Sequence, residues 1–454
     1  MNIINPATEA VITQLQEDTP ATLQQKHQRL RSGFKSWSAT STHERVEILR
    51  KFSALLEQHM EPLAATLTSE VGKPLQQSRN EVNGARTRMK WLVDHAEEYL
   101  REETMTLETG LTEKISYEPL GVICNISAWN YPFLVGVNVF VPALLAGNTV
   151  LYKPSEFATL TGLEIEKLLK TAGVPDDAFQ LAIGGGSIGA TLLDMPFDGY
   201  FFTGSYRTGR YIYEKVAPKM VPCQCELGGK DPLYVADDVA DIVSVAAGTA
   251  DGAFYNNGQS CCAVERIYVH EKVYDQYVDA FIKEVRSWRS GDPTEAGVYI
   301  GPLTRREQLQ VLEDQVSDAL AKGAKLETGG KRMDRRGWYF EPTVLTGVTQ
   351  DMKVVREESF GPIIGIMKVR DDAQALELMN DNEYGLTAAV YTKDRERAEK
   401  LLAGLDAGTG YWNCCDRVSA AVPWSGRKHS GFGSTLSHAG LRAFTKPKAW
   451  HLRG

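Results

Sequence analysis

The stretch GVICNISAWNYPFLVGVNVFVPALLAGNTVLYK, residues 121–153, decides the fold class. It begins and ends with short apolar runs typical of buried strands, Gly121–Ile126 and Thr149–Tyr152, and a helix is expected to start near Pro132 between them. A strand, a helix and a second strand form the parallel unit that a doubly wound sheet repeats. The sequence therefore predicts an α/β fold.

The same alternation continues along the chain. Strands are expected at Phe179–Ile183, Gly199–Phe202, Glu265–Val269 and Leu386–Tyr391, and helices at Leu160–Thr171, Thr208–Val216, Ile242–Phe254, Val273–Trp288 and Arg395–Ala403. Helical periodicity covers residues 42–110 with a start signal at Thr42 and Glu44, whereas Ala443–Trp450 is strand-like. Because 454 residues are too many for one compact core, two or three domains are expected, and the renewed alternation after Ala236 predicts two doubly wound α/β domains.

The composition narrows the class of partner. The chain is 43% hydrophobic and 24% charged, has a net charge of −8 and carries no dense Lys/Arg block. These values argue against nucleic acid or an anionic membrane as a partner, so a small molecule is the expected ligand. The N-terminus lacks a basic stretch followed by a long apolar run, and polar and helix-breaking residues interrupt Phe133–Ala146. A cytoplasmic location is therefore predicted.

Seven cysteines are present, and six of them fall in three tight clusters, which favours reduced thiols over structural disulfides. Cys223 and Cys225 could bind a metal, but no Cys-x-x-Cys pair or His cluster completes a tetrahedral set, so no metal site is predicted. Cys261 differs because it lies in the polar turn Asn256–Cys262, directly after a predicted helix. A thiol there is placed to act as a nucleophile, and an inert turn cysteine is the alternative.

Two further polar side chains follow predicted strands. Glu226 stands before two glycines that allow close backbone approach, so it is a candidate general base, with an exposed turn residue as the alternative. Asn130 stands where a strand ends and a helix starts. Its amide could donate to an oxyanion or only cap the helix.

Several segments are candidates for binding a nucleotide. Thr203–Ser205 lies between a strand and a helix, which is a phosphate-binding position. Gly184–Gly189 matches G-x-G-x-x-G, a pattern that is weak alone and also suits a tight turn. Lys153–Glu156 and Glu357–Pro362 offer groups that could meet a ribose, although each segment alone also suits a solvated loop.

The order of these segments resembles that of the aldehyde dehydrogenase superfamily over essentially the whole chain. The resemblance implies that Cys261, in the Gly-Gln-x-Cys motif, attacks the aldehyde and that Cys262 is only its neighbour. It also implies that Glu226 is the general base, and that Asn130 and the backbone amide of Cys261 form the oxyanion hole. Relatives that transfer the acyl group to coenzyme A usually lack this glutamate, so hydrolysis to a carboxylic acid is implied.

The resemblance also implies NAD as the cofactor, with NADP as the alternative. Lys153 and Glu156 would bind the adenosine ribose, Ser205 the pyrophosphate, and Glu358 with Phe360 the nicotinamide ribose and ring. The other expected cofactor contacts are Trp129, Ser155, Gly185, Thr203, Gly204, Gly209 and Leu227. Preference for NAD is expected because a carboxylate at Glu156 would repel a 2′-phosphate.

Domains follow from the same resemblance. A cofactor-binding domain would comprise residues 1–103 and 118–228, and a catalytic domain residues 229–425. Residues 104–117 and 426–454 would form an oligomerisation element, in which a hairpin near Thr104–Tyr117 and the C-terminal strand reach a partner subunit. A homodimer or homotetramer is implied.

A small-molecule aldehyde is the expected substrate, but the sequence does not identify it. The candidate tunnel lining is Tyr131, Val135, Asn138, Trp412, Cys415, Arg417, Val418 and Trp424. Arg417 could favour aldehydes that carry a distant carboxylate. A surface ion pair between Arg417 and Asp416 is the alternative.

Two other classes of protein compete with this interpretation. A cysteine hydrolase also uses a thiol and a carboxylate, but it needs a partner histidine, and none stands in a comparable motif. A structural protein would not need Cys261, Glu226, Asn130 and Lys153 together. Reduction of nicotinamide at saturating aldehyde would separate the dehydrogenase from both.

Overall fold

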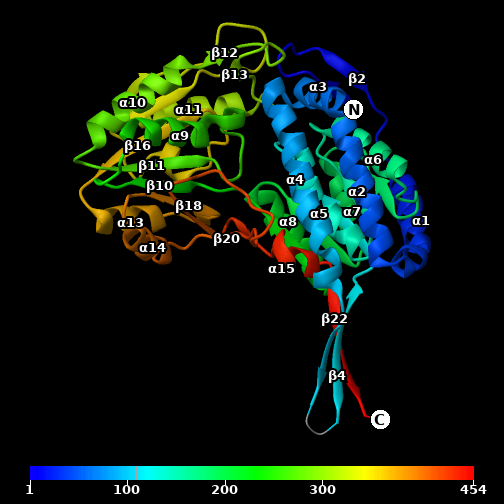
Figure 1. The fold of residues 1–454 in the computed structure, drawn as a ribbon. Coiled ribbons are helices and arrows are strands. Elements are labelled where there is room, and N and C mark those ends of the chain that lie inside the picture. Colours follow the sequence, from blue (N-terminus) through cyan, green and yellow to red (C-terminus); the bar gives the residue numbers. More distant parts are fainter. Residues whose placement is uncertain (108–109, 454) are drawn as a thin grey trace.

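The computed structural model describes residues 1–107 and 110–453. Two large sheets form the centres of two α/β bodies, and a slender strand element projects away from them (Figure 1). The predicted fold class, with two α/β units and a small strand-based element, is confirmed. The residue boundaries given for the three domains stay a prediction.

The first sheet has the strand order β21-β9-β8-β5-β6-β7. Its strands are β5 (Val122–Ile126), β6 (Thr149–Lys153), β7 (Phe179–Leu181), β8 (Gly199–Thr203), β9 (Cys223–Glu226) and the antiparallel β21 (Gly431–Phe432). The helices between them are α5 (Pro132–Leu145), α6 (Thr159–Ala172), α7 (Gly186–Asp194) and α8 (Tyr206–Val216). Pro132 is the first residue of α5, where its missing N–H costs no hydrogen bond. Because β5, β6, β8 and β9 are parallel, the polar residues that follow them share one edge of the sheet.

Four helices at the N-terminus pack beside this sheet (Figure 1). They are α1 (Pro20–Ala39), α2 (Thr42–Gln58), α3 (Met60–Val71) and α4 (Leu75–Leu100). Ser41 caps α2 in a reciprocal pair with Glu44, one residue before the expected start. The helical stretch predicted to residue 110 is too long, because the chain leaves the core after Leu100 and forms β3 (Glu103–Thr106).

The second sheet has the order β14-β15-β16-β11-β10-β18-β19. Its strands are β10 (Asp231–Val235), β11 (Val264–His270), the antiparallel β14 (Lys325–Thr328), β15 (Thr343–Thr346), β16 (Ile363–Val369), β18 (Thr387–Tyr391) and β19 (Thr409–Trp412). The helices of this body are α9 (Ile242–Phe254), α10 (Tyr274–Ser287), α11 (Gln308–Ala321), α12 (Lys353–Arg356), α13 (Asp372–Asn380) and α14 (Arg395–Ala403). Helix α9 has the same bounds as the helix predicted at Ile242–Phe254, so Cys261 lies shortly after the end of a helix.

The projecting element is a three-stranded antiparallel sheet of β3, β4 (Thr112–Pro119) and β22 (Thr445–Leu452) (Figure 1). The observed C-terminal strand β22 begins two residues after the predicted start, because Ala443 is the C-cap residue of helix α15 (Ser437–Arg442). Two residues of the predicted hairpin, 108 and 109, lie outside the described residues, as does the last residue of the predicted element, 454. Strands β3, β4 and β22 of the predicted oligomerisation element therefore pair with each other, whereas its other two strands, β20 (Arg427–Lys428) and β21, pair with β17 (Tyr384–Gly385) and β9.

Smaller elements complete the chain. They are β1 (Asn2–Ile4), β2 (Val11–Gln14), β12 (Arg289–Ser290), β13 (Val298–Ile300), β17 (Tyr384–Gly385), β20 (Arg427–Lys428) and the 3₁₀ turns η1 (Ala217–Lys219) and η2 (Tyr255–Gly258). The turn η2 connects α9 to the segment that carries Cys261, and its two asparagines adopt left-handed backbone angles. Across residues 1–107 and 110–453, no helix is long and apolar enough to cross a membrane.

Candidate active site

A cavity of about 870 Å³ lies where the carboxyl edge of the first sheet faces the second body. It brings together most of the residues that the sequence singled out, although they come from distant segments. The predicted residues that line it are Trp129, Asn130, Tyr131, Val135, Asn138, Lys153, Ser155, Glu156, Thr203, Gly204, Ser205, Glu226, Leu227, Cys261, Glu358, Phe360, Val418 and Trp424. The three candidate catalytic residues thus share one cavity with the candidate nucleotide-binding residues.

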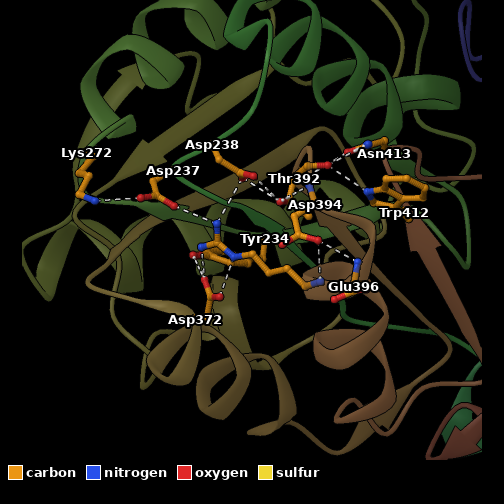
Figure 2. A network of polar contacts seen from close by, with 11 residues as sticks. Tyr234, Asp237, Asp238, Lys272, Asp372, Thr392, Asp394, Glu396, Trp412 and Asn413 are labelled. Carbon is orange, nitrogen blue, oxygen red and sulfur yellow. Dashed lines mark hydrogen bonds and ion pairs between the residues drawn. The ribbon is translucent and has the colours of Figure 1, made fainter.

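Trp412 lies outside this lining. It is the last residue of β19, and side chains alternate across a strand, so the neighbouring Tyr411 is buried while Trp412 is exposed. Figure 2 shows Trp412 beside Thr392 and Asn413, and its Nε1 donates to the carbonyl oxygen of Thr392 (2.9 Å). Its expected place in the substrate tunnel is corrected accordingly.

Arg417 and Cys415 are also outside the main lining. Both contact a second cavity of about 750 Å³, which shares Tyr255 and Asp416 with the first. Arg417 is exposed, whereas Cys415 is buried and its thiol donates to the carbonyl oxygen of Gly248 (3.8 Å). Arg417, which was expected at the mouth of the substrate tunnel, therefore lies outside the lining of the main cavity.

Two predicted cofactor glycines do not line the cavity either. Gly209 brings α8 against Leu227, since a Cβ at this position would overlap the leucine side chain. Gly185 stands just before α7, and the cavity is lined instead by Gly186 and Gly189. Gly209 therefore allows Leu227, which lines the cavity, to pack against α8.

Adjacent thiols at positions 261 and 262 have different surroundings. Cys261 is half-buried and lines the cavity, whereas Cys262 is buried and its Sγ donates to Oδ1 of Asp416 (3.1 Å). A hydrogen bond with Cys261, together with burial and Asp416, raises the pKa of the Cys262 thiol well above its usual range. Cys262 is thus held as a neutral thiol, and only Cys261 is placed to react.

The turn that carries Cys261 is fixed by side-chain amides. Asn257 Nδ2 donates to the carbonyl oxygens of Gly301 and Pro302 (both 2.8 Å), and Asn256 Nδ2 donates to the carbonyl oxygen of Asn130 (3.2 Å). Asparagine is one of the few side chains that tolerates the left-handed backbone found at both positions. The turn is therefore held against both the Asn130 loop and the second body.

Glu226 ends β9 and faces the cavity. Its Oε1 accepts a hydrogen bond from the hydroxyl of Thr435. Burial raises the pKa of Glu226 to about 7, and the Thr435 hydrogen bond and the positive charge of Arg88 limit the rise. A carboxyl group with this pKa can exchange a proton near neutral pH.

Asn130 is anchored through its backbone and its side chain. Its Nδ2 donates to the carbonyl oxygen of Gln259 (3.1 Å), two residues before Cys261. Its own carbonyl oxygen accepts from Nζ of Lys73 (2.8 Å), a buried lysine paired with Glu81. Because an amide NH₂ has two N–H groups, one remains for an oxyanion at Cys261.

The other end of the cavity has the groups that a dinucleotide needs. Lys153 ends β6 and is buried, and Ser155 Oγ donates to Oε2 of Glu156 (3.1 Å). Ser205 occupies the N-cap position of α8 without a side-chain capping hydrogen bond, so the first backbone N–H groups of this helix can meet a phosphate. A cation, a ribose acceptor and a helix N-terminus in one cavity fit a nicotinamide dinucleotide.

Glu358 and Phe360, from the second body, also line this cavity. The N–H of Gly229 donates to Oε1 of Glu358 (3.0 Å), and burial raises the pKa of Glu358 to about 8. The ring of Phe360 meets the ring of Trp129 edge-on at 5.4 Å. Gly228 lines the cavity and also allows Glu358 to pack against the backbone, since a Cβ there would overlap the Glu358 carboxylate.

Some residues of the site were missed from the sequence. They are Arg88, Asp416 and Thr435, and the buried pairs Lys73–Glu81 and Lys230–Glu265. A signal existed for part of this set, because Gln77, Glu81 and Arg88 recur at helical spacing on α4 among apolar neighbours. Polar residues on a buried face indicate a site or an ion pair.

The fold and the cavity together describe an α/β protein in which an accessible thiol, Cys261, shares a cavity with groups that fit a dinucleotide. A model of the aldehyde dehydrogenase family matches residues 1–450, and the chain belongs to this family. It is 34% identical over 457 residues to a peroxisomal aminoaldehyde dehydrogenase of Pisum sativum, covering 98% of this chain and 91% of the relative. It is 34% identical over 422 residues to an NADP-dependent succinate-semialdehyde dehydrogenase of Deinococcus radiodurans, covering 93% and 88% of the two chains.

Solved structures agree with this assignment. The betaine aldehyde dehydrogenase of Staphylococcus aureus, solved with NAD⁺, has a TM-score of 0.95 and 31% identity, covering 99% of this chain and 91% of that chain. The predicted family, enzyme class and cofactor, NAD with NADP as the alternative, are confirmed: this enzyme oxidises aldehydes with NAD(P). Within the described parts of the chain, no group of three or more His, Cys, Asp or Glu side chains could hold a metal ion.

Proposed function

We propose that the enzyme converts its aldehyde to a carboxylic acid through a thioester on Cys261, and that Glu226 activates the water that hydrolyses it. The observation that carries the proposal is that the accessible thiol and a carboxyl group with a pKa of about 7 line one cavity. No histidine is among the residues that line this cavity in the described chain, which disfavours a cysteine hydrolase.

The first step forms a carbon–sulfur bond. The Cys261 thiolate attacks the aldehyde carbon, and the carbonyl electron pair moves to oxygen. The free N–H of the Asn130 amide and the backbone N–H of Cys261 stabilise that oxyanion. When bound, NAD(P) supplies the acceptor for the hydride that leaves this carbon, so the product on sulfur is a thioester.

The second step returns the thiolate. Glu226 takes a proton from water while the water oxygen attacks the thioester carbon, and the carbon–sulfur bond then breaks. Thr435 holds Oε1 of Glu226, which leaves Oε2 to meet the water. The products are a carboxylic acid and a free Cys261.

Binding of the cofactor is assigned to the other end of the cavity. Lys153 and Glu156 bind the adenosine ribose, the α8 N-terminus with Ser205 binds the pyrophosphate, and Glu358 with Phe360 binds the nicotinamide riboside. Trp129, Ser155, Thr203, Gly204 and Leu227 line the same end and complete the site, while Tyr131 and Trp424 face the aldehyde.

Assembly and location are part of this proposal. The projecting sheet of β3, β4 and β22 extends away from both bodies, so a partner subunit could cover it in a homodimer or homotetramer (Figure 1). A cytoplasmic location stays a prediction, and the pea relative is named as peroxisomal.

The test is the substitution Glu226→Gln, which keeps the shape of the side chain and removes the base. The first turnover should release about one equivalent of reduced cofactor per site, followed by slow turnover, because the thioester accumulates. In the wild type, the hydrolysis rate should rise with pH through about 7, where Glu226 loses its proton. Formation of stoichiometric acyl-CoA by the wild type with aldehyde, NAD and CoA would contradict the proposal.

A further inference from the structure

Arg88 brings a guanidinium group into the cavity that holds Cys261. It comes from α4, whose neighbouring residues Ala85, Met89 and Leu92 are buried in the core. The side chain itself is half-buried and lines the cavity with Asn130, Tyr131 and Asn138. The segments in which the sequence predicted site residues do not include Arg88.

One nitrogen of the guanidinium is fixed by the protein. Nη1 of Arg88 donates to Oδ1 of Asn138 (3.0 Å) and to the carbonyl oxygen of Leu134 (3.4 Å), both on α5. Within residues 1–107 and 110–453, Nε and Nη2 have no hydrogen-bond partner, and no carboxylate forms an ion pair with Arg88. Neither nitrogen is sealed from solvent, unlike Nε of the neighbouring Arg86. The open edge of the guanidinium is therefore available to a ligand.

The charge of Arg88 is poorly compensated. Burial lowers the pKa of Arg88, and the nearby Cys262, Glu226, Cys261 and Glu81 counteract this effect. An arginine nevertheless remains charged in a protein. Glu226 is neutral for part of the time near pH 7, and Glu81 is already paired with Lys73. An anion in the cavity would complete the charge balance.

We propose that Arg88 binds a carboxylate of the substrate, so that the enzyme prefers short aldehydes with a carboxylate at the far end. The guanidinium would bind the carboxylate through Nε and Nη2, the edge that the protein leaves open, while Asn138 fixes its orientation. The inference rests on the proposed function, because it places the substrate chain between Arg88 and Cys261.

Asp416 is the competing group, since it would instead favour an aldehyde with an amine. Its Oδ1 already accepts from Cys262 Sγ (3.1 Å) and Ser260 Oγ (3.3 Å). Burial raises the pKa of Asp416 to about 6, so a small fraction of this carboxyl group is neutral near pH 7, whereas an arginine stays charged. Arg417, the arginine first considered for a carboxylate, is exposed at the second cavity. Arg88 is therefore the better placed of the two arginines.

The experiment compares three aldehydes of equal chain length on the full-length enzyme: 4-oxobutanoate, butanal and 4-aminobutanal. Arg88→Gln should lower kcat/KM for 4-oxobutanoate by about 10- to 100-fold relative to butanal, the range for a lost charged hydrogen-bond pair. Arg88→Lys should retain part of the preference. Lys90→Gln, at an exposed position of the same helix, is the matched control. It should leave kcat/KM for 4-oxobutanoate and for butanal unchanged.

A second measurement does not need turnover. Butanedioate should slow the alkylation of Cys261 by iodoacetamide in the wild type and not in Arg88→Gln, as followed by mass spectrometry of the Cys261 peptide. If no aldehyde is oxidised, the proposed function fails, while this protection still tests Arg88. Equal losses for 4-oxobutanoate and butanal, or a preference for 4-aminobutanal, would overturn the inference.

Discussion

A buried lysine–glutamate pair stands behind each end of the cavity, and the two pairs support different loops. At the aldehyde end, Lys73 pairs with Glu81 behind the loop that carries Asn130. At the nicotinamide end, Lys230 pairs with Glu265 (2.5 Å) behind the loop that carries Glu358 and Phe360. Both lysines have a lowered pKa because of burial, which the paired glutamate counteracts.

The contacts differ in a way that bears on function. Lys73 donates directly to the carbonyl oxygen of Asn130, and Glu81 Oε1 accepts from the N–H of Phe133 (2.9 Å) in the first turn of α5. Glu265 instead accepts the N–H groups of Ser359 (2.8 Å) and Phe360 (3.0 Å). The first pair thus orients a group proposed for chemistry, and the second orients a surface proposed for the cofactor. A buried ion pair adds little net stability, so its role here is to hold each loop in position.

The largest effect is expected at the aldehyde end, where bonds form and break. Cys261→Ser should lower turnover by roughly 10⁴- to 10⁶-fold, the range for loss of a covalent nucleophile. Cys262→Ser is the matched control and should keep most of the activity, because its thiol is directed at Asp416. The turnover of both variants is measured as the rate of NAD reduction at saturating aldehyde. Equal losses in the two variants would remove the distinction between the thiols.

Loss of the oxyanion donor should have the next largest effect. Asn130→Ala should lower kcat by roughly 10²- to 10³-fold, because one N–H to the oxyanion is removed. The KM for NAD should change little, since this side chain contacts the Cys261 turn. An unchanged kcat, in conditions where chemistry limits the rate, would reject the role.

The Lys73–Glu81 pair should act on kcat through Asn130. In Lys73→Met the loop loses its anchor, and kcat should fall by about 10- to 100-fold, as expected for a misplaced catalytic group. Leaving Glu81 unpaired in the interior also costs stability, about 3–5 kcal/mol. The double variant Lys73→Met, Glu81→Leu should recover the melting temperature but not kcat. Wild-type kcat in the double variant would show that the pair does not position Asn130.

The Lys230–Glu265 pair should act on the cofactor instead. Glu265→Gln keeps one acceptor for the Ser359–Phe360 backbone and weakens the pairing with Lys230. The KM for NAD should rise by about tenfold, with kcat within about threefold, a modest range for a single weakened contact. Glu271→Gln, exposed just beyond the end of the same strand, is the control. A fall in kcat with an unchanged KM would erase the contrast between the two pairs.

The sequence predicted the residues that line the cavity better than the buried lysine–glutamate pairs behind them. Cys261, Glu226, Asn130 and Ser205 could be found because each follows a regular element in a short segment with its own pattern. The supporting pairs could not, because Lys230 meets a residue 35 positions away and Lys73 reaches Asn130, 57 positions away. Such partners are brought together only by the packing of distant elements.

The error at Trp412 has a different origin. The resemblance placed its segment near the tunnel, but a residue on a strand faces one side or the other, and the pleat turned this side chain away. Val418, in the segment that follows the strand, does line the cavity. Segment-level assignments were therefore more accurate than assignments of single side chains.

The smallest effect is expected at the adenosine end, where the choice between NAD and NADP is made. Glu156 accepts from Ser155 Oγ and would accept from a ribose hydroxyl, whereas a 2′-phosphate would meet a like charge. Lys153 offsets part of this repulsion, although its Nζ donates to the carbonyl oxygen of Pro154 (3.2 Å). A preference for NAD of about tenfold in kcat/KM corresponds to roughly 1.4 kcal/mol. Glu156→Gln should reduce the preference for NAD without changing kcat with NAD. Lys153→Met should instead weaken the binding of both NAD and NADP. Comparable kcat/KM for NAD and NADP in the wild type would show that the lysine outweighs the carboxylate.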